Sequence, residues 1–584
     1  MALLRLSGDR HLPRETAAAA TGEPVGRITM KAIFAPLSRL FSTALFIAAI
    51  SQGAPAKTVA TPVAQSEARC AELGAVRLQG GRVTSATFES AAAAKAGSPE
   101  APARPANCVV QGSINQRIGI DGRPYAIRFE LRLPAAWSGR FYYQGGAGVD
   151  GVVPPADGVY PSGEHGQSAL LSGMAVVTTD SGHEAVSGVG NGAFLFGADP
   201  QARDEYGDQQ LPLVTDAAKR LIAQYYGRAP EWSYFYGCSN GGRQAMAAAQ
   251  KWPYLFDGII ACSPGFRLAQ ASIQGSIVRA QLAATIAPKK ADGTPDISHA
   301  LTAAQQDVIK ALILRSCDAL DGVADGMVSH PSQCRVEPLK WVCAADQSQN
   351  CLSPEVARYV RAFLAGGTLR DGRVIYSSIP ADPQIVQYMG SEPEMYVGLF
   401  AGEASHVYTT PPTMTPDLIG YALKADADTE YRKLFASSAV FTRSGADFTN
   451  ADSPNMDAFQ RHGGKIIIYS GSADWAFPSP DVEAYYQSVQ KRYGKAGTDS
   501  FARLYIVPGM LHGPSPYATD RFDVMGAMID WVERGAAPDT LLAKAAPDAA
   551  WPGRTRPLCA FPKESTYNGS GSIEQATSFH CHAP

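Results

Sequence analysis

Short apolar runs alternate with amphipathic stretches in two separate parts of the chain. In the first part, strands are expected at Ala126–Leu133, Arg140–Tyr143, Met174–Thr179, Ser233–Tyr236 and Gly258–Cys262, and helices at Leu213–Tyr226 and Gly241–Lys251. Continuous apolar strands that alternate with helices are typical of a parallel sheet with both faces covered. The pattern therefore predicts an α/β fold.

The alternation stops near residue 264 and resumes near residue 464, after a loop-rich stretch with a helix expected at Ala303–Leu314. In the second part, strands are expected at Lys465–Tyr469 and Leu504–Val507, and helices at Asp481–Tyr493 and Asp520–Arg534. We predict one catalytic domain formed by residues 57–263 and 464–584, with a second domain inserted at 264–463. The Ala-, Pro- and Ser-rich stretch before Asn107 is expected to be mostly loop with some helix.

The amino terminus has the pattern of a secretory signal. Positive residues precede the apolar run Leu40–Ile50, and residues 54–56 (APA) offer a cleavage site. We predict a discarded leader over residues 1–56, with translation starting at Met30, and a mature protein that is secreted or periplasmic. The alternative is an uncleaved amino-terminal anchor. No other stretch has the length and hydrophobicity of a membrane span, so none is expected in the mature chain.

Composition excludes several classes of protein. The 584 residues carry a formal net charge of −3, with 18% charged and 45% hydrophobic residues. These values argue against a disordered chain and against nucleic-acid binding, which usually requires a basic excess. The cysteines number ten, an even count that fits an exported enzyme with several disulfide bonds. No feature points to an obligate protein partner.

The segment Gly237–Gly241 (GCSNG) matches the pattern G-x-S-x-G between a predicted strand and a predicted helix. Glycines on both sides of the serine avoid clashes in this sharp turn, which exposes the serine hydroxyl at the carboxyl edge of the sheet. We therefore predict that Ser239 is a nucleophile. The alternative is a glycine-rich turn whose serine caps the helix.

A serine nucleophile needs a base, and the base needs a group that orients it. Asp474 and His512 each follow a predicted strand closely, and 38 residues separate them. Enzymes with this turn order the residues as serine, acid and histidine, so Asp474 is the predicted acid and His512 the predicted base. His183 is the competing base, but it precedes the serine. Asp481 is the alternative acid, but it stands where the next helix begins.

The tetrahedral intermediate of acyl transfer requires two N–H donors. One is expected from the backbone of Asn240, directly after the nucleophile. The other is expected from the loop Gln144–Gly148 (QGGAG), which follows an earlier strand. The residues alone leave open which glycine donates, and a plain flexible turn is the alternative for this loop.

The chain resembles the tannase and feruloyl esterase family from about Cys70 to its carboxyl end. The segments that carry the resemblance are FYYQGGAG, TTDSGH, YFYGCSNGGRQAM, CDALDGVADGMV, YSGSAD, LYIVPGMLHG with TDRFD, and RTRPLCAFP. The resemblance implies an α/β-hydrolase fold with a large lid inserted after the nucleophile half. It also implies a triad of Ser239, Asp474 and His512, with Asn240 and Gly148 as oxyanion donors. The activity it implies is that of a serine esterase that cleaves feruloyl, galloyl or related phenolic esters through an acyl-enzyme.

Three carboxylates lie within the eight residues from Asp318 to Asp325. Alone, this pattern fits either a calcium loop or a solvated acidic turn. The resemblance implies a structural Ca²⁺, and the ligands it implies are the side chains of Asp318, Asp321 and Asp325 and the carbonyls of Val323 and Met327. Zinc is not expected, because the neighbouring cysteines are better used in disulfides.

The resemblance also implies the disulfide pairs Cys70–Cys108, Cys317–Cys334, Cys343–Cys351 and Cys559–Cys581. One family feature is missing from this chain. The family joins a cysteine before the serine to a cysteine after the histidine, whereas His512 is followed by Gly513. Cys238 has another candidate partner in Cys262, at the end of the neighbouring predicted strand. These two form either a disulfide, which the usual Cα spacing allows, or two free buried thiols.

Substrate choice depends on the lid. In the family branch that hydrolyses terephthalate monoesters, an aromatic residue that holds the substrate ring corresponds to Phe477. An arginine that binds the substrate carboxylate corresponds to Met395. No arginine occurs from Val374 to Tyr431, so the resemblance favours a neutral aromatic ester as the small-molecule substrate. The alternatives are a terephthalate monoester hydrolase with a rebuilt acid pocket, and a calcium-stabilised binding protein on an inactive hydrolase scaffold.

Overall fold

The structure is a computed structural model that describes residues 62–93, 103–163, 166–347, 349–390 and 393–583. The predicted leader and its cleavage site lie outside these residues.

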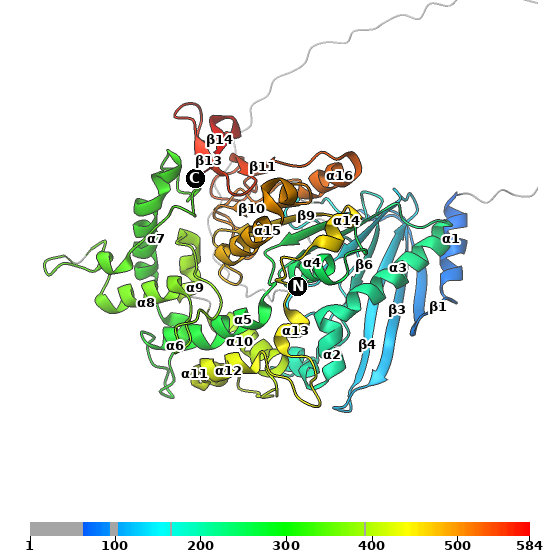
Figure 1. The fold of residues 1–584 in the computed structure, drawn as a ribbon, viewed down its shortest axis with the longest axis horizontal. Coiled ribbons are helices and arrows are strands. Elements are labelled where there is room, and N and C mark those ends of the chain that lie inside the picture. The colour runs from blue at the N-terminus through cyan, green and yellow to red at the C-terminus, as the bar shows by residue number, and fades with distance from the viewer. Residues whose placement is uncertain (1–61, 94–102, 164–165, 348, 391–392, 584) are drawn as a thin grey trace, which may run out of the picture. The chain divides into compact units, whose positions relative to one another are not determined.

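A ten-stranded sheet runs in the order β1-β2-β3-β4-β6-β5-β7-β8-β9-β10 (Figure 1). Its strands are β1 (Arg77–Leu78), β2 (Gly81–Glu89), β3 (Asn107–Ile118), β4 (Pro124–Pro134), β5 (Arg140–Gln144), β6 (Ala175–Thr179), β7 (Trp232–Cys238), β8 (Gly258–Cys262), β9 (Lys465–Gly471) and β10 (Ala502–Val507). Strands β1 to β4 pair antiparallel, and β6, β5 and β7 to β10 pair parallel. The α/β class predicted from the sequence is confirmed.

Side chains of the central strands alternate between two hydrophobic cores, as the period of a strand requires. On β9, Ile466 and Ile468 face the first core, whereas Ile467 and Tyr469 face the second. The first core is covered by α1 (Pro62–Leu73), α3 (Gln210–Tyr226), α4 (Asn240–Lys251), α14 (Asp457–His462) and α15 (Ser479–Asp499). The second is covered by α16 (Val524–Arg534) and the antiparallel pair β11 (Thr540–Lys544) and β12 (Thr555–Cys559).

The described residues between β8 and β9 add helices but no strand to this sheet. These helices include α5 (Leu268–Ile273), α6 (Arg279–Ala284), α7 (Ala303–Cys317), α8 (Pro354–Ala365), α9 (Gln387–Gly390), α10 (Pro393–Gly402), α11 (Leu418–Lys424), α12 (Ala427–Lys433) and α13 (Gly445–Thr449). Their hydrophobic core also contains Trp475, Ala476 and Phe477, which follow β9. The inserted segment therefore packs against a loop at the carboxyl edge of the sheet. The boundaries at residues 264 and 463 stay predictions.

The remaining elements are shorter. They include α2 (Pro200–Asp204), which continues into a π-helical turn at Glu205–Gln209, and the pair β13 (Glu564–Tyr567) and β14 (Phe579–His582). Two further π-helical turns occur in the inserted segment, at Gln274–Val278 and Glu403–Tyr408.

Two stretches differ from the sequence expectation. The segment before Asn107 contributes α1, β1 and β2, so it extends the sheet instead of forming mostly loop. Only Val83 is buried in β2, and the strand therefore has no apolar run that reveals it. Helix α16 begins at Val524, not at Asp520, because the Asp523 side chain caps it by accepting the N–H of Gly526.

The ten cysteines form five disulfide bonds. The pairs are Cys70–Cys108, Cys238–Cys262, Cys317–Cys334, Cys343–Cys351 and Cys559–Cys581. Four of them are the pairs that the resemblance implies. Cys238 and Cys262, for which a disulfide or two free thiols were the alternatives, form a disulfide. Disulfides in this number are typical of proteins from oxidising compartments.

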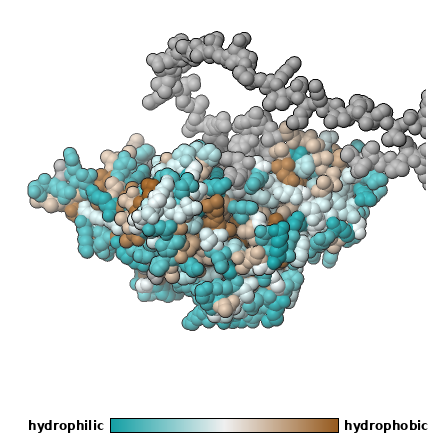
Figure 2. Space-filling view, turned by 90° about the horizontal axis from the view of Figure 1, so that it is seen from above, coloured by the Kyte–Doolittle hydropathy of each residue, from teal (hydrophilic) through white to brown (hydrophobic). Residues whose placement is uncertain are grey.

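The described residues visible in Figure 2 form no large hydrophobic area on that face. On the side shown in Figure 2, polar residues predominate and hydrophobic residues form small separate groups. Exposed large apolar side chains, such as Val152, Tyr254, Phe435 and Leu542, come from different segments. Within the described ranges, no helix is both long enough and apolar enough to cross a membrane.

Candidate active site

Ser239 occupies a sharp turn between β7 and α4. Its backbone is in an unusual conformation, with φ 62° and ψ −123°, which costs of order 1–3 kcal/mol and persists only where neighbours hold it. Two glycines make the turn possible. A β-carbon on Gly237 would lie 2.6 Å from the carbonyl of Gly241, and one on Gly241 would lie 2.5 Å from the carbonyl oxygen of Gly146. The G-x-S-x-G pattern therefore reflects close packing of the turn against the loop after β5.

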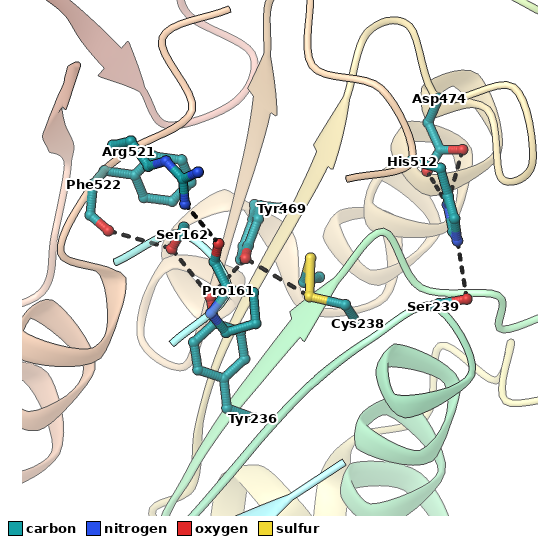
Figure 3. The surroundings of a disulfide bond; sticks show 11 residues. Pro161, Ser162, Tyr236, Cys238, Ser239, Tyr469, Asp474, His512, Arg521 and Phe522 are labelled. Atoms are coloured by element: carbon teal, nitrogen blue, oxygen red, sulfur yellow. Dashed lines mark hydrogen bonds and ion pairs between the residues drawn. A yellow bond between two sulfur atoms is a disulfide. The ribbon is translucent and has the colours of Figure 1, made fainter. Parts of the chain in front are cut away.

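The structure brings Ser239, His512 and Asp474 together (Figure 3). Ser239 Oγ lies 2.9 Å from His512 Nε2, and His512 Nδ1 lies 3.0 and 3.2 Å from the Asp474 carboxylate oxygens. The Asp474 side chain is fully buried. Its Oδ1 accepts the N–H groups of Ala476 and Phe477 at 2.9 and 3.0 Å. This arrangement can transfer a proton from the serine hydroxyl to the imidazole and stabilise the imidazolium that results.

Electrostatics tune the imidazole. Burial lowers the pKa of His512, but the charge of Asp474 and its hydrogen bond outweigh burial, and the net pKa is raised above the ordinary 6.5. A base with a higher pKa accepts the serine proton more readily, provided that it is neutral at the working pH.

The competing residues lie elsewhere. His183 is buried and stacks on Phe196 with ring centroids 3.7 Å apart, and burial lowers its pKa to about 3. Asp481 lies in the first turn of α15 and forms an ion pair with Arg267. Neither side chain contacts the serine or its base in the described interactions.

The loop after β5 faces the nucleophile turn. The N–H of Gly145 donates to the Tyr236 carbonyl at 2.9 Å, and that of Gly146 donates to Gln244 Oε1 at 3.0 Å. These two glycines are therefore engaged within the protein. Gly148 has φ 54°, and a β-carbon there would meet nothing within 4 Å, so this residue borders open space. Gly148 therefore stays the candidate among the glycines of this loop for the second oxyanion donor.

Asp150 is a functional candidate that the sequence did not reveal. Its carboxylate accepts hydrogen bonds from Asn240 Nδ2 at 2.5 Å, from Gln244 Nε2 at 2.8 Å and from Ser181 Oγ. Burial raises its pKa, and these hydrogen bonds oppose the rise. Asp150 thereby ties the loop after β5 to the first turn of α4. Its signal in the sequence was only its place two residues after Gly148.

Aromatic side chains form one side of the site. Phe477 is buried, and its ring centroid lies 5.1 Å from that of His512. Trp475 packs against Tyr388 and Tyr396 of the inserted segment, with centroids 4.9 and 4.2 Å away. Met395 is 62% exposed, so its substrate-binding role stays a prediction.

Arg279 is a second candidate that the sequence did not reveal, because it lies well before the arginine-free stretch from Val374 to Tyr431. Its guanidinium lies 4.9 and 5.0 Å from the ring centroids of Phe363 and Trp475, and Nη2 donates to the Trp475 carbonyl at 2.5 Å. Its Nε is buried and unpaired. Burial lowers the pKa of Arg279 to about 10, and the ion pairs of the described residues include none with this side chain.

The acidic loop at Asp318–Met327 is partly satisfied by the protein itself. Asp318 Oδ1 accepts the N–H groups of Asp325 and Gly326, and Asp325 forms an ion pair with Arg556. Asp321 is 1% exposed, its Oδ2 has no hydrogen-bond partner, and burial raises its pKa to about 6. In the part of the chain that the structure describes, no group of three or more acidic, His or Cys residues is arranged to hold a metal.

Comparisons with known proteins identify the family of the chain. The family model "Tannase and feruloyl esterase" matches residues 108–582. A mono(2-hydroxyethyl) terephthalate hydrolase from Piscinibacter sakaiensis is 36% identical, with 83% of this chain and 86% of the relative covered. A probable feruloyl esterase B-1 from Neosartorya fischeri is 27% identical, with 77% and 82% covered. The crystal structure of feruloyl esterase B from Aspergillus oryzae shares the fold, with a TM-score of 0.68, 23% identity, and 88% of this chain and 100% of that chain covered.

Proposed function

Because the chain belongs to the tannase and feruloyl esterase family and is a carboxylic ester hydrolase, we propose that it cleaves aromatic esters with Ser239 as nucleophile. His512 takes the Ser239 proton as the hydroxyl attacks the ester carbonyl. The N–H groups of Asn240 and Gly148 stabilise the oxyanion. His512 then protonates the leaving alcohol, and water releases the acid by the reverse sequence, while Asp474 keeps the imidazole oriented.

The observation that carries this proposal is the 2.9 Å distance between Ser239 Oγ and His512 Nε2. It occurs at a turn in which the Ser239 backbone has an unfavourable conformation. We expect Ser239→Ala to abolish hydrolysis of methyl ferulate while the melting temperature stays near that of the wild type. Ser263→Ala is a matched control, because Ser263 follows β8 as Ser239 follows β7, also has positive φ, and has no hydrogen-bond partner for its hydroxyl.

A fluorophosphonate probe separates an enzyme from an inactive scaffold. The probe should label wild type and Ser263→Ala at Ser239, and it should not label Ser239→Ala. Undiminished hydrolysis by Ser239→Ala would overturn the assignment. If the probe did not label the wild type, the result would favour the alternative of a binding protein on an inactive hydrolase scaffold.

A second candidate substrate is an aromatic ester with a free carboxylate, such as mono(2-hydroxyethyl) terephthalate. Arg279 favours it, because a largely buried guanidinium that forms no ion pair among the described residues is costly unless an anion completes it. The aromatic rings around Trp475 would hold the substrate ring beside this cation.

Arg279→Met separates the two candidates, since methionine keeps the apolar stem and removes the charge. If Arg279 binds a carboxylate, KM for mono(2-hydroxyethyl) terephthalate rises at least about tenfold, while KM for methyl ferulate changes little. If Arg279 only supports Trp475, both substrates lose activity to the same extent.

We further propose that the protein is exported and that the acidic loop holds a structural Ca²⁺. Five disulfides support export. The unpaired oxygen of buried Asp321 supports a cation there, with Asp318, Asp325 and the carbonyls of Val323 and Met327 as the other ligands. The ion would neutralise the carboxylates and stabilise the inserted segment, apart from the reaction itself.

A further inference from the structure

The Cys238–Cys262 disulfide lies directly beside the nucleophile. Strands β7 and β8 are parallel neighbours, and their register places Cys238 opposite Cys262, with Cα atoms 4.2 Å apart. Cys238 immediately precedes Ser239, so the covalent link is one residue from the attacking oxygen (Figure 3). The other four disulfides do not involve a neighbour of Ser239, Asp474 or His512 in the sequence.

The same strand ends also hold the strained backbone of the nucleophile. The Ser239 N–H donates to the Cys262 carbonyl at 3.0 Å, and the Gly265 N–H donates to the Ser239 carbonyl at 3.2 Å. Both hydrogen bonds require the end of β8 to stay at a fixed distance from the end of β7. A disulfide between these two ends enforces that distance.

The sulfur side of the link packs against a hydrogen-bonded chain of hydroxyl groups. Tyr469 OH lies 3.9 Å from Cys238 Sγ and 2.6 Å from Tyr236 OH, which in turn lies 3.0 Å from Ser162 Oγ (Figure 3). Tyr469 belongs to β9, and its carbonyl accepts the Ser263 N–H at 2.7 Å. Three adjacent strands therefore meet at the disulfide. Cys238 is partly exposed, whereas Cys262 is buried, so a small reductant would approach the disulfide from the Cys238 side.

We propose that the Cys238–Cys262 disulfide positions Ser239 for attack and makes the esterase sensitive to thiol reductants. This inference rests on the proposed role of Ser239. On reduction, a dithiothreitol thiolate attacks one sulfur and breaks the S–S bond, forming a mixed disulfide. Its second thiol then closes the oxidised ring. Two electrons pass to the protein, and with two protons they leave Cys238 and Cys262 as thiols. The nucleophile turn then depends on hydrogen bonds alone.

The test compares wild type, Cys238→Ala/Cys262→Ala and the control Cys343→Ala/Cys351→Ala, which removes a disulfide of the inserted segment. We expect the first double variant to lose about tenfold in kcat, with little change in KM, because a small misplacement of a reacting group is costly. Dithiothreitol should lower wild type and the control to the same level, reversibly, and should leave the first variant unchanged.

Two results would overturn the proposal: wild-type kcat in Cys238→Ala/Cys262→Ala, or an undiminished dithiothreitol effect in that variant. If the variant does not fold, alkylation of partly reduced wild type decides, since loss of activity must follow modification of Cys238 or Cys262 and not of the other eight cysteines. Fluorophosphonate labelling of the oxidised wild type tests the role of Ser239 separately. If the probe labels Ser239 at the same rate in the oxidised and the reduced enzyme, only the role of the disulfide is refuted, and the role of Ser239 stands.

Discussion

Gly241→Ala tests how closely the nucleophile turn and the loop after β5 must approach each other. A β-carbon at position 241 would lie 2.5 Å from the carbonyl oxygen of Gly146, where ordinary contact begins at 3.4 Å. The loop must therefore retreat by 3.4 minus 2.5, or about 0.9 Å. The atoms it meets are backbone, including the carbonyl carbon of Gly145 at 3.0 Å, so no side chain can rotate away.

A shift of about 1 Å in a catalytic group costs on the order of 100-fold in rate. The loop carries the proposed donor Gly148, whereas Asp474 and His512 are on other segments. We therefore expect kcat/KM for methyl ferulate to fall by about 100-fold, and the free energy of unfolding to fall by about 1–3 kcal/mol. Steady-state kinetics and denaturant unfolding measure the two effects.

Gly190→Ala is the matched control. A β-carbon at position 190 would meet nothing within 4 Å, and its φ is not positive. This variant should keep wild-type activity and stability. Wild-type kcat/KM in Gly241→Ala would show that the loop and the turn do not need this approach, and the reasoning would fail.

Three further predictions concern pH, the inserted segment and calcium. Neutral His512 must accept the serine proton, so kcat/KM should fall as pH drops through a midpoint above 6.5, and Asp474→Asn should move that midpoint down. Buried Asp382 accepts Ser472 Oγ at 2.9 Å, and Ser472 Oγ accepts the Gly509 N–H at 2.8 Å, so Asp382→Ala should cost about 1–3 kcal/mol of unfolding free energy while Asp382→Asn costs less. Calcium at 100 times its Kd should stabilise wild type by about 2.7 kcal/mol in denaturant unfolding, and Asp321→Asn should lose this increment.

The triad was predictable because its residues follow buried parallel strands. Such strands form continuous apolar runs, as in KIIIY and LYIV, and their carboxyl ends meet at one edge of the sheet. Ser239, Asp474 and His512 could therefore be placed together without any knowledge of side-chain positions. Strand β2 gave no such signal, since it is exposed along most of its length.

Contacts between distant segments could not be predicted in this way. Arg279 and Trp475 are 196 positions apart, and no periodicity connects a helix of the inserted segment with a loop after β9. The pairing of Cys238 with Cys262 was open for a related reason. Adjacent parallel strands place two residues at similar height, but only the register shows that they are opposite each other.

The loop after β9 connects the acid of the proposed triad with the core of the inserted segment. Asp474 Oδ1 accepts the N–H groups of Ala476 and Phe477, and both of these residues belong to the hydrophobic core of the inserted segment. A change in that core which shifts the Phe477 backbone also shifts one of the donors to the carboxylate. Because this carboxylate raises the pKa of His512, substitutions that alter the substrate pocket are expected to alter the pH profile as well. We therefore expect substitutions in this core to change substrate preference and the pH profile together.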